Sequence, residues 1–167
     1  MNNKNSAIVL RMIEQNDIAL LVEYRLKYLA EMQGEQAVQN IEATRKSLET
    51  YFAKMLDKNS FFAFGAELNG AVVSFGGMVV KEIPGDFISA TYFEGDILNM
   101  YTVPEARRKG ISQMILEALM KEAAARGISK VALHTSKDGE HLYRKNGFAE
   151  PVYPYLELVI KKENFTH

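Results

Sequence analysis

The stretch Tyr101-Thr-Val-Pro-Glu-Ala-Arg-Arg-Lys-Gly-Ile-Ser112 connects two elements that decide the fold. An expected strand over residues 96–103 precedes it, and an expected helix over residues 111–126 follows it. Apolar residues recur along that helix at a spacing of three and four, and Gly127 ends it. A further strand is expected over residues 130–135. A strand, a helix and a strand in this order predict a parallel strand pair.

The remaining elements follow from hydrophobic periodicity and turn residues. Asn69-Gly70 predicts a two-residue hairpin, because both residues tolerate positive φ. Gly76-Gly77 indicates a bulge or a close backbone approach within a strand. Asp17 is the expected cap of the first helix. The other expected elements are strands at 7–13, 60–66, 71–80 and 155–160, helices at 17–32, 41–58 and 137–146, and a loop at 33–40. Residues 81–93 fit no element.

The order of the elements predicts an α/β (α+β) fold, a mixed and mostly antiparallel twisted sheet flanked by helices. The length of 167 residues fits one domain over residues 1–167. The net charge of −1 argues against nucleic acid held by overall charge. The chain has no cysteine, which excludes disulfides and cysteine nucleophiles. No apolar run approaches the ~18 residues of a membrane span, and we expect a cytoplasmic protein.

The loop before the helix at 111–126 has the chemistry of an anion site. The N-terminus of a helix presents unpaired N–H groups and a partial positive charge. Gly110 leaves the backbone open there, and Arg107, Arg108 and Lys109 add positive charge. These features favour a phosphate or pyrophosphate. A solvated basic turn is the alternative that the same residues allow.

Two motifs resemble those of the GCN5-related N-acetyltransferase family. Arg107-Arg108-Lys109-Gly110-Ile111-Ser112 resembles the family pattern Arg/Gln-x-x-Gly-x-Gly/Ala, with Ser112 in place of the last Gly or Ala. The later segment Leu142-Tyr-Arg-Lys-Asn-Gly-Phe148 resembles the family pattern Leu-Tyr-x-x-x-Gly-Phe. Together the motifs span about a third of the chain, from residue 98 to residue 148.

The resemblance implies direct transfer of an acetyl group from acetyl-CoA to an amine. It implies that the parallel strands splay apart, so that the pantetheine arm pairs with the backbone of Met100, Tyr101 and Val103. It places the pyrophosphate on the loop and helix start, formed by Arg107, Arg108, Lys109, Gly110, Ile111 and Ser112. Ser136 either lines the thiol channel or caps the next helix.

Three side chains are candidates for moving protons. The resemblance makes Tyr143 the general acid for the leaving thiolate, and a core aromatic is the alternative. Glu94 and Asp96 lie two residues apart on one face of a strand, and either is a candidate base. A solvated strand entry is the alternative for both. No His, Asp or Glu spacing resembles a metal site.

The resemblance also implies that the first two helices, the loop at 33–40 and the segment at 82–93 wall the acceptor site, and these walls are rich in acids. They carry Glu31, Glu35, Glu82, Asp86, Glu94 and Asp96. This favours a small cationic amine as acceptor. Arg25 interrupts the apolar stripe of the first helix. It is either an edge residue with its charge in water or a group that holds the carboxylate of an amino acid acceptor.

The sequence therefore predicts an acetyl-CoA-dependent N-acetyltransferase for a small-molecule amine, with no metal and no nucleic acid or membrane partner. A non-catalytic acyl-CoA-binding or sensing module of the same fold is the alternative. Whether the chain forms a homodimer is left open.

Overall fold

The computed structural model describes residues 7–160, and its strands form one sheet. Adjacent strands lie in the order β1-β2-β3-β4-β5, and the β4–β5 pair is parallel while the other pairs are antiparallel. The strands are β1 (Val9–Met12), β2 (Phe61–Leu68), β3 (Ala71–Pro84), β4 (Thr91–Thr102) and β5 (Ile128–Ala132). The mixed, mostly antiparallel sheet with one parallel pair is confirmed.

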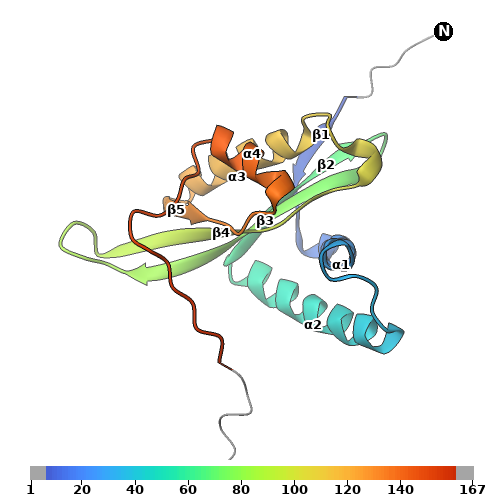
Figure 1. Ribbon diagram of the computed structural model, residues 1–167, viewed down its shortest axis with the longest axis horizontal. Coiled ribbons are helices and arrows are strands. Elements are labelled where there is room, and N and C mark those ends of the chain that lie inside the picture. The colour runs from blue at the N-terminus through green and yellow to red at the C-terminus, as the bar shows by residue number, and fades with distance from the viewer. Residues whose placement is uncertain (1–6, 161–167) are drawn as a thin grey trace, which may run out of the picture. The chain divides into compact units, whose positions relative to one another are not determined.

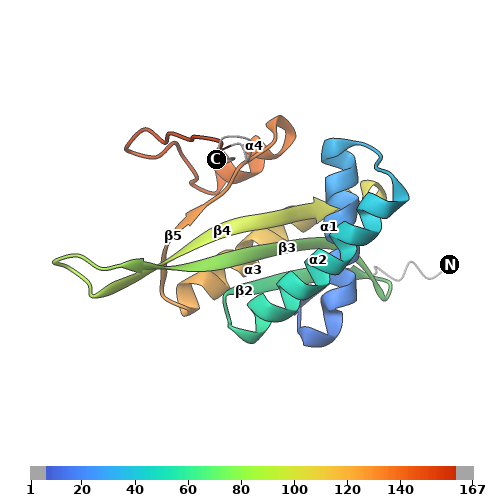
Figure 2. The same ribbon diagram turned by 90° about the horizontal axis from the view of Figure 1, so that it is seen from below.

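Helices cover both faces of this sheet. Figures 1 and 2 show α1 and α2 on one face and α3 on the other. The helices are α1 (Ile18–Gln33), α2 (Val38–Asp57), α3 (Ile111–Ala125) and α4 (Lys137–Lys145), with 3₁₀ turns η1 (Gln15–Asp17) and η2 (Pro104–Ala106). The chain falls into two compact units, one ending at His134 and one beginning at Thr135 with α4. The single domain stays a prediction.

Each helical face of the sheet has its own apolar layer. On one face, buried residues of α1 and α2 pack with β2 and β3; they include Leu21, Val22, Tyr24, Phe52, Phe61, Ala63 and Phe75. On the other face α3 packs on β2 and β3. The buried residues of α3 are Ile111, Ile115, Leu116, Leu119 and Ala123. The expected stripe of the helix at 111–126 is therefore its buried face.

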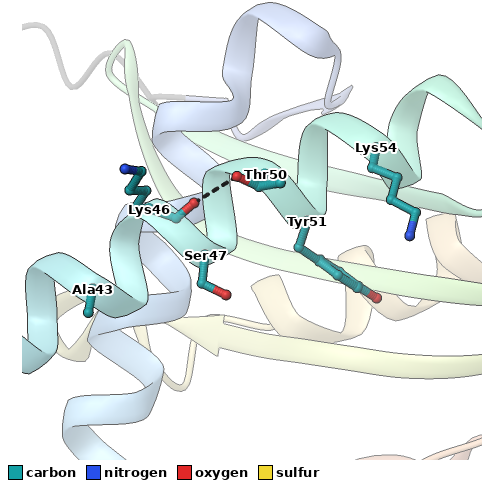
Figure 3. Close-up of a pocket in the computed structure, with 6 residues that line it drawn as sticks. All are labelled: Ala43, Lys46, Ser47, Thr50, Tyr51 and Lys54. Carbon is teal, nitrogen blue, oxygen red and sulfur yellow. Dashed lines mark hydrogen bonds between the residues drawn. The ribbon is translucent and has the colours of Figure 1, made fainter.

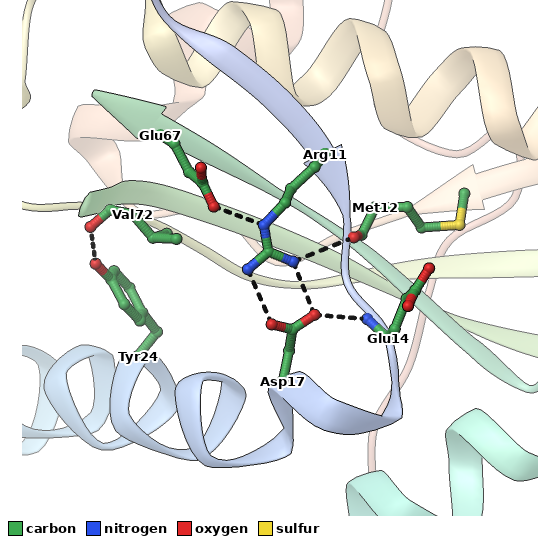
Figure 4. Close-up of polar contacts among 7 residues, drawn as sticks. All are labelled: Arg11, Met12, Glu14, Asp17, Tyr24, Glu67 and Val72. Carbon is green, nitrogen blue, oxygen red and sulfur yellow. Dashed lines mark hydrogen bonds and ion pairs between the residues drawn. The ribbon is translucent and has the colours of Figure 1, made fainter. Parts of the chain in front are cut away.

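Arg11 joins the edge of the sheet to the start of α1 (Figure 4). Its guanidinium donates to Glu67 Oε1 at 2.6 Å and to both carboxylate oxygens of Asp17, at 2.8 and 2.9 Å. The Asp17 carboxylate also accepts from the Glu14 N–H at 2.9 Å. Asp17 does precede α1, but it makes no side-chain cap to that helix. The expectation of a capping Asp17 is wrong because Arg11 and Glu14 hold its carboxylate.

A bulge interrupts the pairing of β3 with β4 at the middle of the sheet. Phe75 pairs with Tyr101 and Gly77 with Leu98, so Gly76 alone faces two residues of β4. One of these, Asn99, has a φ of 63°. A Cβ on Gly76 would lie 2.4 Å from Met100 Sδ and 2.5 Å from Ile115 Cγ2. The expected bulge and the expected close approach are both present.

Several elements begin or end away from their expected positions. Strands reach into residues 81–93 from both sides, since β3 extends to Pro84 and β4 begins at Thr91, and only residues 85–90 are irregular. The tip of this hairpin projects past the other strands (Figure 2). The second helix begins at Val38, and no side chain caps it, so no capping residue marked its start. β5 begins at Ile128, directly after Gly127, whose φ is 70°.

The strand expected over residues 155–160 is wrong. No described strand pairs with this segment, and Tyr155, Leu156, Leu158, Val159 and Ile160 are all exposed. The alternation of residue types is typical of a half-buried strand. A strand also needs a hydrogen-bonding partner, and sequence alternation carries no information about one.

Candidate active site

The loop after η2 brings two left-handed residues to the start of α3. Arg108 has a φ of 61° and Gly110 a φ of 76°. Such conformations turn successive backbone N–H groups toward a common point and form anion-binding concavities. Gly110 is the N-cap of α3, and a Cβ built on it has no neighbour within 4 Å. The backbone is therefore open to a ligand where the helix dipole is positive.

Arg107 holds this loop to the rest of the fold. Its Nε donates to the Thr102 carbonyl at 2.9 Å, and its Nη2 donates to Glu31 Oε2 at 2.6 Å. The guanidinium also lies 5.7 Å from the centre of the Tyr101 ring. The bond to Glu31 raises the pKa of Arg107 above its usual value. Arg107 is thus paired within the protein, whereas Arg108 and Lys109 are exposed.

A chain of three hydroxyl groups ties the helix start to the sheet. Thr102 Oγ1 lies 2.7 Å from Ser74 Oγ and 2.9 Å from Ser112 Oγ. Ser74 Oγ also donates to the Tyr101 carbonyl at 3.1 Å. Ser74 and Thr102 are buried. The serine at the position of a family Gly or Ala is thus used for this link, which sequence reasoning missed because Ser74 is remote in the chain.

The backbone of β4 has an edge without a strand partner next to this loop. β5 pairs with β4 only between Phe93 and Asp96, and no described strand pairs with residues 97–102 on that side. The Val103 N–H donates to the Val73 carbonyl at 2.9 Å, toward β3. Because successive N–H groups of a regular strand point to opposite edges, the N–H of Tyr101 faces β3 and that of Thr102 faces the open edge, while Met100 lies in the bulge.

The two candidate bases are both ion-paired. Glu94 Oε1 lies 2.6 Å from Lys130 Nζ on β5, and Asp96 pairs with Lys81 on β3. The structure places both carboxylates on β4, as expected from their spacing. It brings each of them to a lysine rather than to one another.

Ser136 and Tyr143 both lie in the second unit. Ser136 is the N-cap of α4, and its Oγ accepts from the Gly139 N–H at 3.2 Å. Tyr143 is buried on α4, and its ring meets that of Phe148 edge-on, with centroids 5.6 Å apart. The capping alternative for Ser136 is thus observed. The role of Ser136 in the thiol channel and that of Tyr143 as general acid stay predictions.

The bulge in β4 carries a polar pair that sequence reasoning only half anticipated. Arg25 of α1 donates from Nη1 to Asn99 Oδ1. Asn99 is 5% exposed, and its Nδ2 has no hydrogen-bond partner within the described part of the chain, residues 7–160. Asn99 was not a candidate, although a lone Asn between apolar strand residues was a usable signal, since Asn tolerates positive φ.

The acids expected in the acceptor walls are mostly engaged. Glu31 pairs with Arg107, and Glu94 and Asp96 pair with lysines. Asp86 Oδ1 accepts from the N–H groups of Ile88 and Ser89 and from the Tyr92 hydroxyl. These bonds hold the pKa of Asp86 below its usual value. The net negative charge offered to a cationic ligand is therefore smaller than the count of acids suggests.

Comparison with known proteins identifies the family. The model of the acetyltransferase (GNAT) family matches residues 24–148. The chain belongs to this family. A GNAT enzyme is an N-acetyltransferase, and the chain is accordingly an enzyme of acetyl transfer that uses acetyl-CoA. This favours the enzyme over the binding-only module.

Solved structures of GNAT proteins share the fold. A predicted acetyltransferase from Clostridium acetobutylicum, solved with acetyl-CoA, is 32% identical, with a TM-score of 0.79 over 92% of this chain and 96% of that one. A GCN5-related N-acetyltransferase from Ralstonia eutropha is 24% identical, with a TM-score of 0.75 over 91% and 99%. Glucosamine-6-phosphate N-acetyltransferase from Arabidopsis thaliana is 17% identical, with a TM-score of 0.66 over 91% and 98%. No curated protein matches the chain.

Residues 7–160 of this GNAT chain contain neither a cluster of metal ligands nor a helix suited to a membrane. No group of three or more His, Cys, Asp or Glu in that range could hold a metal ion. None of the helices in that range is long and apolar enough to cross a membrane.

Replacing Thr102 by valine tests the hydroxyl chain. Valine keeps the shape of threonine but leaves the hydroxyls of Ser74 and Ser112 without their shared partner. We expect Thr102→Val to lower the free energy of unfolding by about 1–3 kcal/mol, measured by urea denaturation. Thr50→Val, on the exposed side of α2, is the control and should change it little. An equal loss in both variants would contradict the structural role of the chain.

Proposed function

We propose that this enzyme transfers the acetyl group of acetyl-CoA directly to the amine of a small molecule. Acetyl-CoA supplies an acyl carbon bound through a thioester. The amine nitrogen bonds to that carbon while the carbon–sulfur bond breaks, the amine loses a proton and the sulfur gains one. The observation that carries the proposal is the loop at the start of α3, in which Arg108 and Gly110 have left-handed backbone conformations. This loop follows the part of β4 whose edge has no strand partner among residues 7–160.

The loop residues are proposed to hold the pyrophosphate. Arg108 and Lys109 are exposed and supply charge, and the N–H groups of Gly110, Ile111 and Ser112 lie in the first turn of α3. The open space at Gly110 supports this fit, since no atom lies where its Cβ would be. Arg107 contributes by fixing the loop through Glu31 and Thr102.

The edge of β4 is proposed to hold the pantetheine arm along Met100, Tyr101 and Val103. Met100 is proposed as the donor, because the N–H groups of Tyr101 and Val103 face β3. The Val103 N–H already donates to Val73. A backbone donor fixed by the sheet can stabilise negative charge that develops on the thioester oxygen.

Tyr143 is proposed to give the proton to the leaving sulfur. A phenol has a reference pKa of about 10 and therefore carries its proton at neutral pH, so a nearby tyrosine can donate a hydrogen bond or that proton to the departing thiolate. Glu94 or Asp96 is proposed to accept the proton from the amine, directly or through water. Whichever carboxylate acts as the base must first weaken its ion pair with Lys130 or Lys81.

Gly110→Asp tests the pyrophosphate site. Asp and Asn both tolerate positive φ, so Gly110→Asn is a control of nearly equal size without the charge. The Asp carboxylate would repel the pyrophosphate. We expect the Kd for acetyl-CoA, measured by calorimetry, to rise about tenfold or more relative to the Asn variant. Equal affinities in the two folded variants would overturn the assignment of the loop.

Tyr143→Phe tests the general acid. The substitution keeps the buried ring and removes only the hydroxyl. We expect kcat to fall by roughly 10²–10⁴-fold, with little change in the affinity for acetyl-CoA, as followed by thiol release. Tyr155→Phe, which alters an exposed hydroxyl of the same unit, is the control and should leave kcat unchanged. If the two variants keep the same kcat, Tyr143 has only a structural role.

A further inference from the structure

Arg25 is a half-buried cation that has no carboxylate within ion-pair distance among residues 7–160. By contrast, ion pairs with carboxylates are formed by Arg11, Arg45, Arg107, Arg126 and Arg144. Burial lowers the pKa of Arg25 from its usual value. A guanidinium removed from water without a counter-ion is unfavourable, so the position favours an added anion.

Asn99 offers a second unsatisfied donor at the same point. Its Oδ1 accepts from Arg25, which fixes the orientation of the amide, because the opposite orientation would turn an NH₂ group toward the cation. The Asn99 Nδ2 group then points away from Arg25, and it is buried without a hydrogen-bond partner among residues 7–160. An unpaired buried N–H is costly, and a ligand acceptor would satisfy it.

Two tyrosine side chains lie near the Arg25 guanidinium. The Arg25 guanidinium lies 5.4 Å from the centre of the Tyr28 ring. Burial raises the pKa of the Tyr51 phenol, and the positive charge of Arg25 opposes this increase. Tyr51 lines an open depression on α2 together with Lys46 and Lys54 (Figure 3). A guanidinium and an amide NH₂ favour an anion over a cation.

We propose that Arg25 and Asn99 bind a carboxylate of the acceptor, so that the acceptor is an amino acid or a related amine with a carboxyl group. The planar carboxylate has two oxygens, one for the guanidinium and one for the amide NH₂. This inference rests on the proposed function, in which the thioester lies along β4 from Met100 onward. Asn99 is the residue before Met100, which places the amine of such an acceptor near the acyl carbon. It replaces the cationic acceptor expected from the acid count.

The first test compares amine acceptors that carry a carboxylate with acceptors in which that carboxylate is neutralised, absent or replaced by a phosphate. Amino acids, their carboxamides, the corresponding decarboxylated amines and phosphoethanolamine are assayed with acetyl-CoA by thiol release. We expect kcat/KM for the amino acids to exceed that for their carboxamides by about tenfold or more. Preference for carboxamides or decarboxylated amines would overturn the proposal. Preference for phosphoethanolamine over every amino acid would also overturn it.

The second test uses variants and separates ligand binding from a structural role. Arg25→Met removes the charge, and Asn99→Asp places a carboxylate beside Arg25 while tolerating positive φ. We expect both to bring the ratio of kcat/KM between amino acid and carboxamide close to one. Arg45→Met, which removes an exposed arginine paired with Glu23, should keep the wild-type ratio. A lower rate with an unchanged ratio in Arg25→Met and Asn99→Asp would show a structural role and overturn the proposal.

A third measurement distinguishes failure of this inference from failure of the proposed function. Thermal denaturation of the protein is followed with each amino acid and carboxamide in the presence of CoA, without turnover. We expect amino acids to raise Tm in the wild type and not in Arg25→Met. If no amine is acetylated and this stabilisation is present, the proposed function is wrong and the carboxylate site stands. If acetylation occurs and carboxamides stabilise as well as amino acids, only the carboxylate site is wrong.

Discussion

The extra residue of β4 at Asn99 is the constraint on which the site depends. Two residues of β4 lie opposite Gly76, and Asn99 takes a left-handed conformation there. Gly76 permits this because α3 and Met100 occupy the space of a side chain. The bulge turns Asn99 into the fold, where its amide meets Arg25 of α1. The pairing of β4 with β5 ends at Asp96, before the bulge. The part of β4 that follows therefore has one edge without a strand partner among the described residues, which is open to a ligand.

The same strand fixes the anion-binding loop at its other end. Thr102 links Ser74 of β3 and Ser112 of α3, and its carbonyl accepts from Arg107. Arg107 then reaches Glu31 near the end of α1. The left-handed conformation of Arg108 is unfavourable for a residue with a Cβ, by about 1–2 kcal/mol. These contacts hold the loop in an anion-binding conformation before an anion is bound. Less conformational entropy of the loop is then lost on binding.

Local signals predicted the parts of the fold that depend on neighbours in the chain. Asn69-Gly70 forms the expected turn, with φ values of 54° and 80°, and α3 ends before Gly127 as its sequence indicates. The anion loop was predictable because its charges and Gly110 are contiguous. Asn99 and the hydroxyl chain were not, because their partners lie far away: Arg25 is 74 residues from Asn99, and Ser74 is 28 from Thr102. The prediction of a strand at 155–160 failed for the same reason, because the residue pattern carries no information about a partner strand.

A crystal structure of the protein with CoA and an amino acid tests the central claim most directly. We expect the pyrophosphate within hydrogen-bond distance of the backbone N–H groups at the start of α3, and pantetheine along β4 from Met100. We also expect the amino acid carboxylate on Arg25 Nη and Asn99 Nδ2. Pyrophosphate bound away from the start of α3, or a carboxylate bound elsewhere while Asn99 Nδ2 stays without a partner, would contradict the central claim.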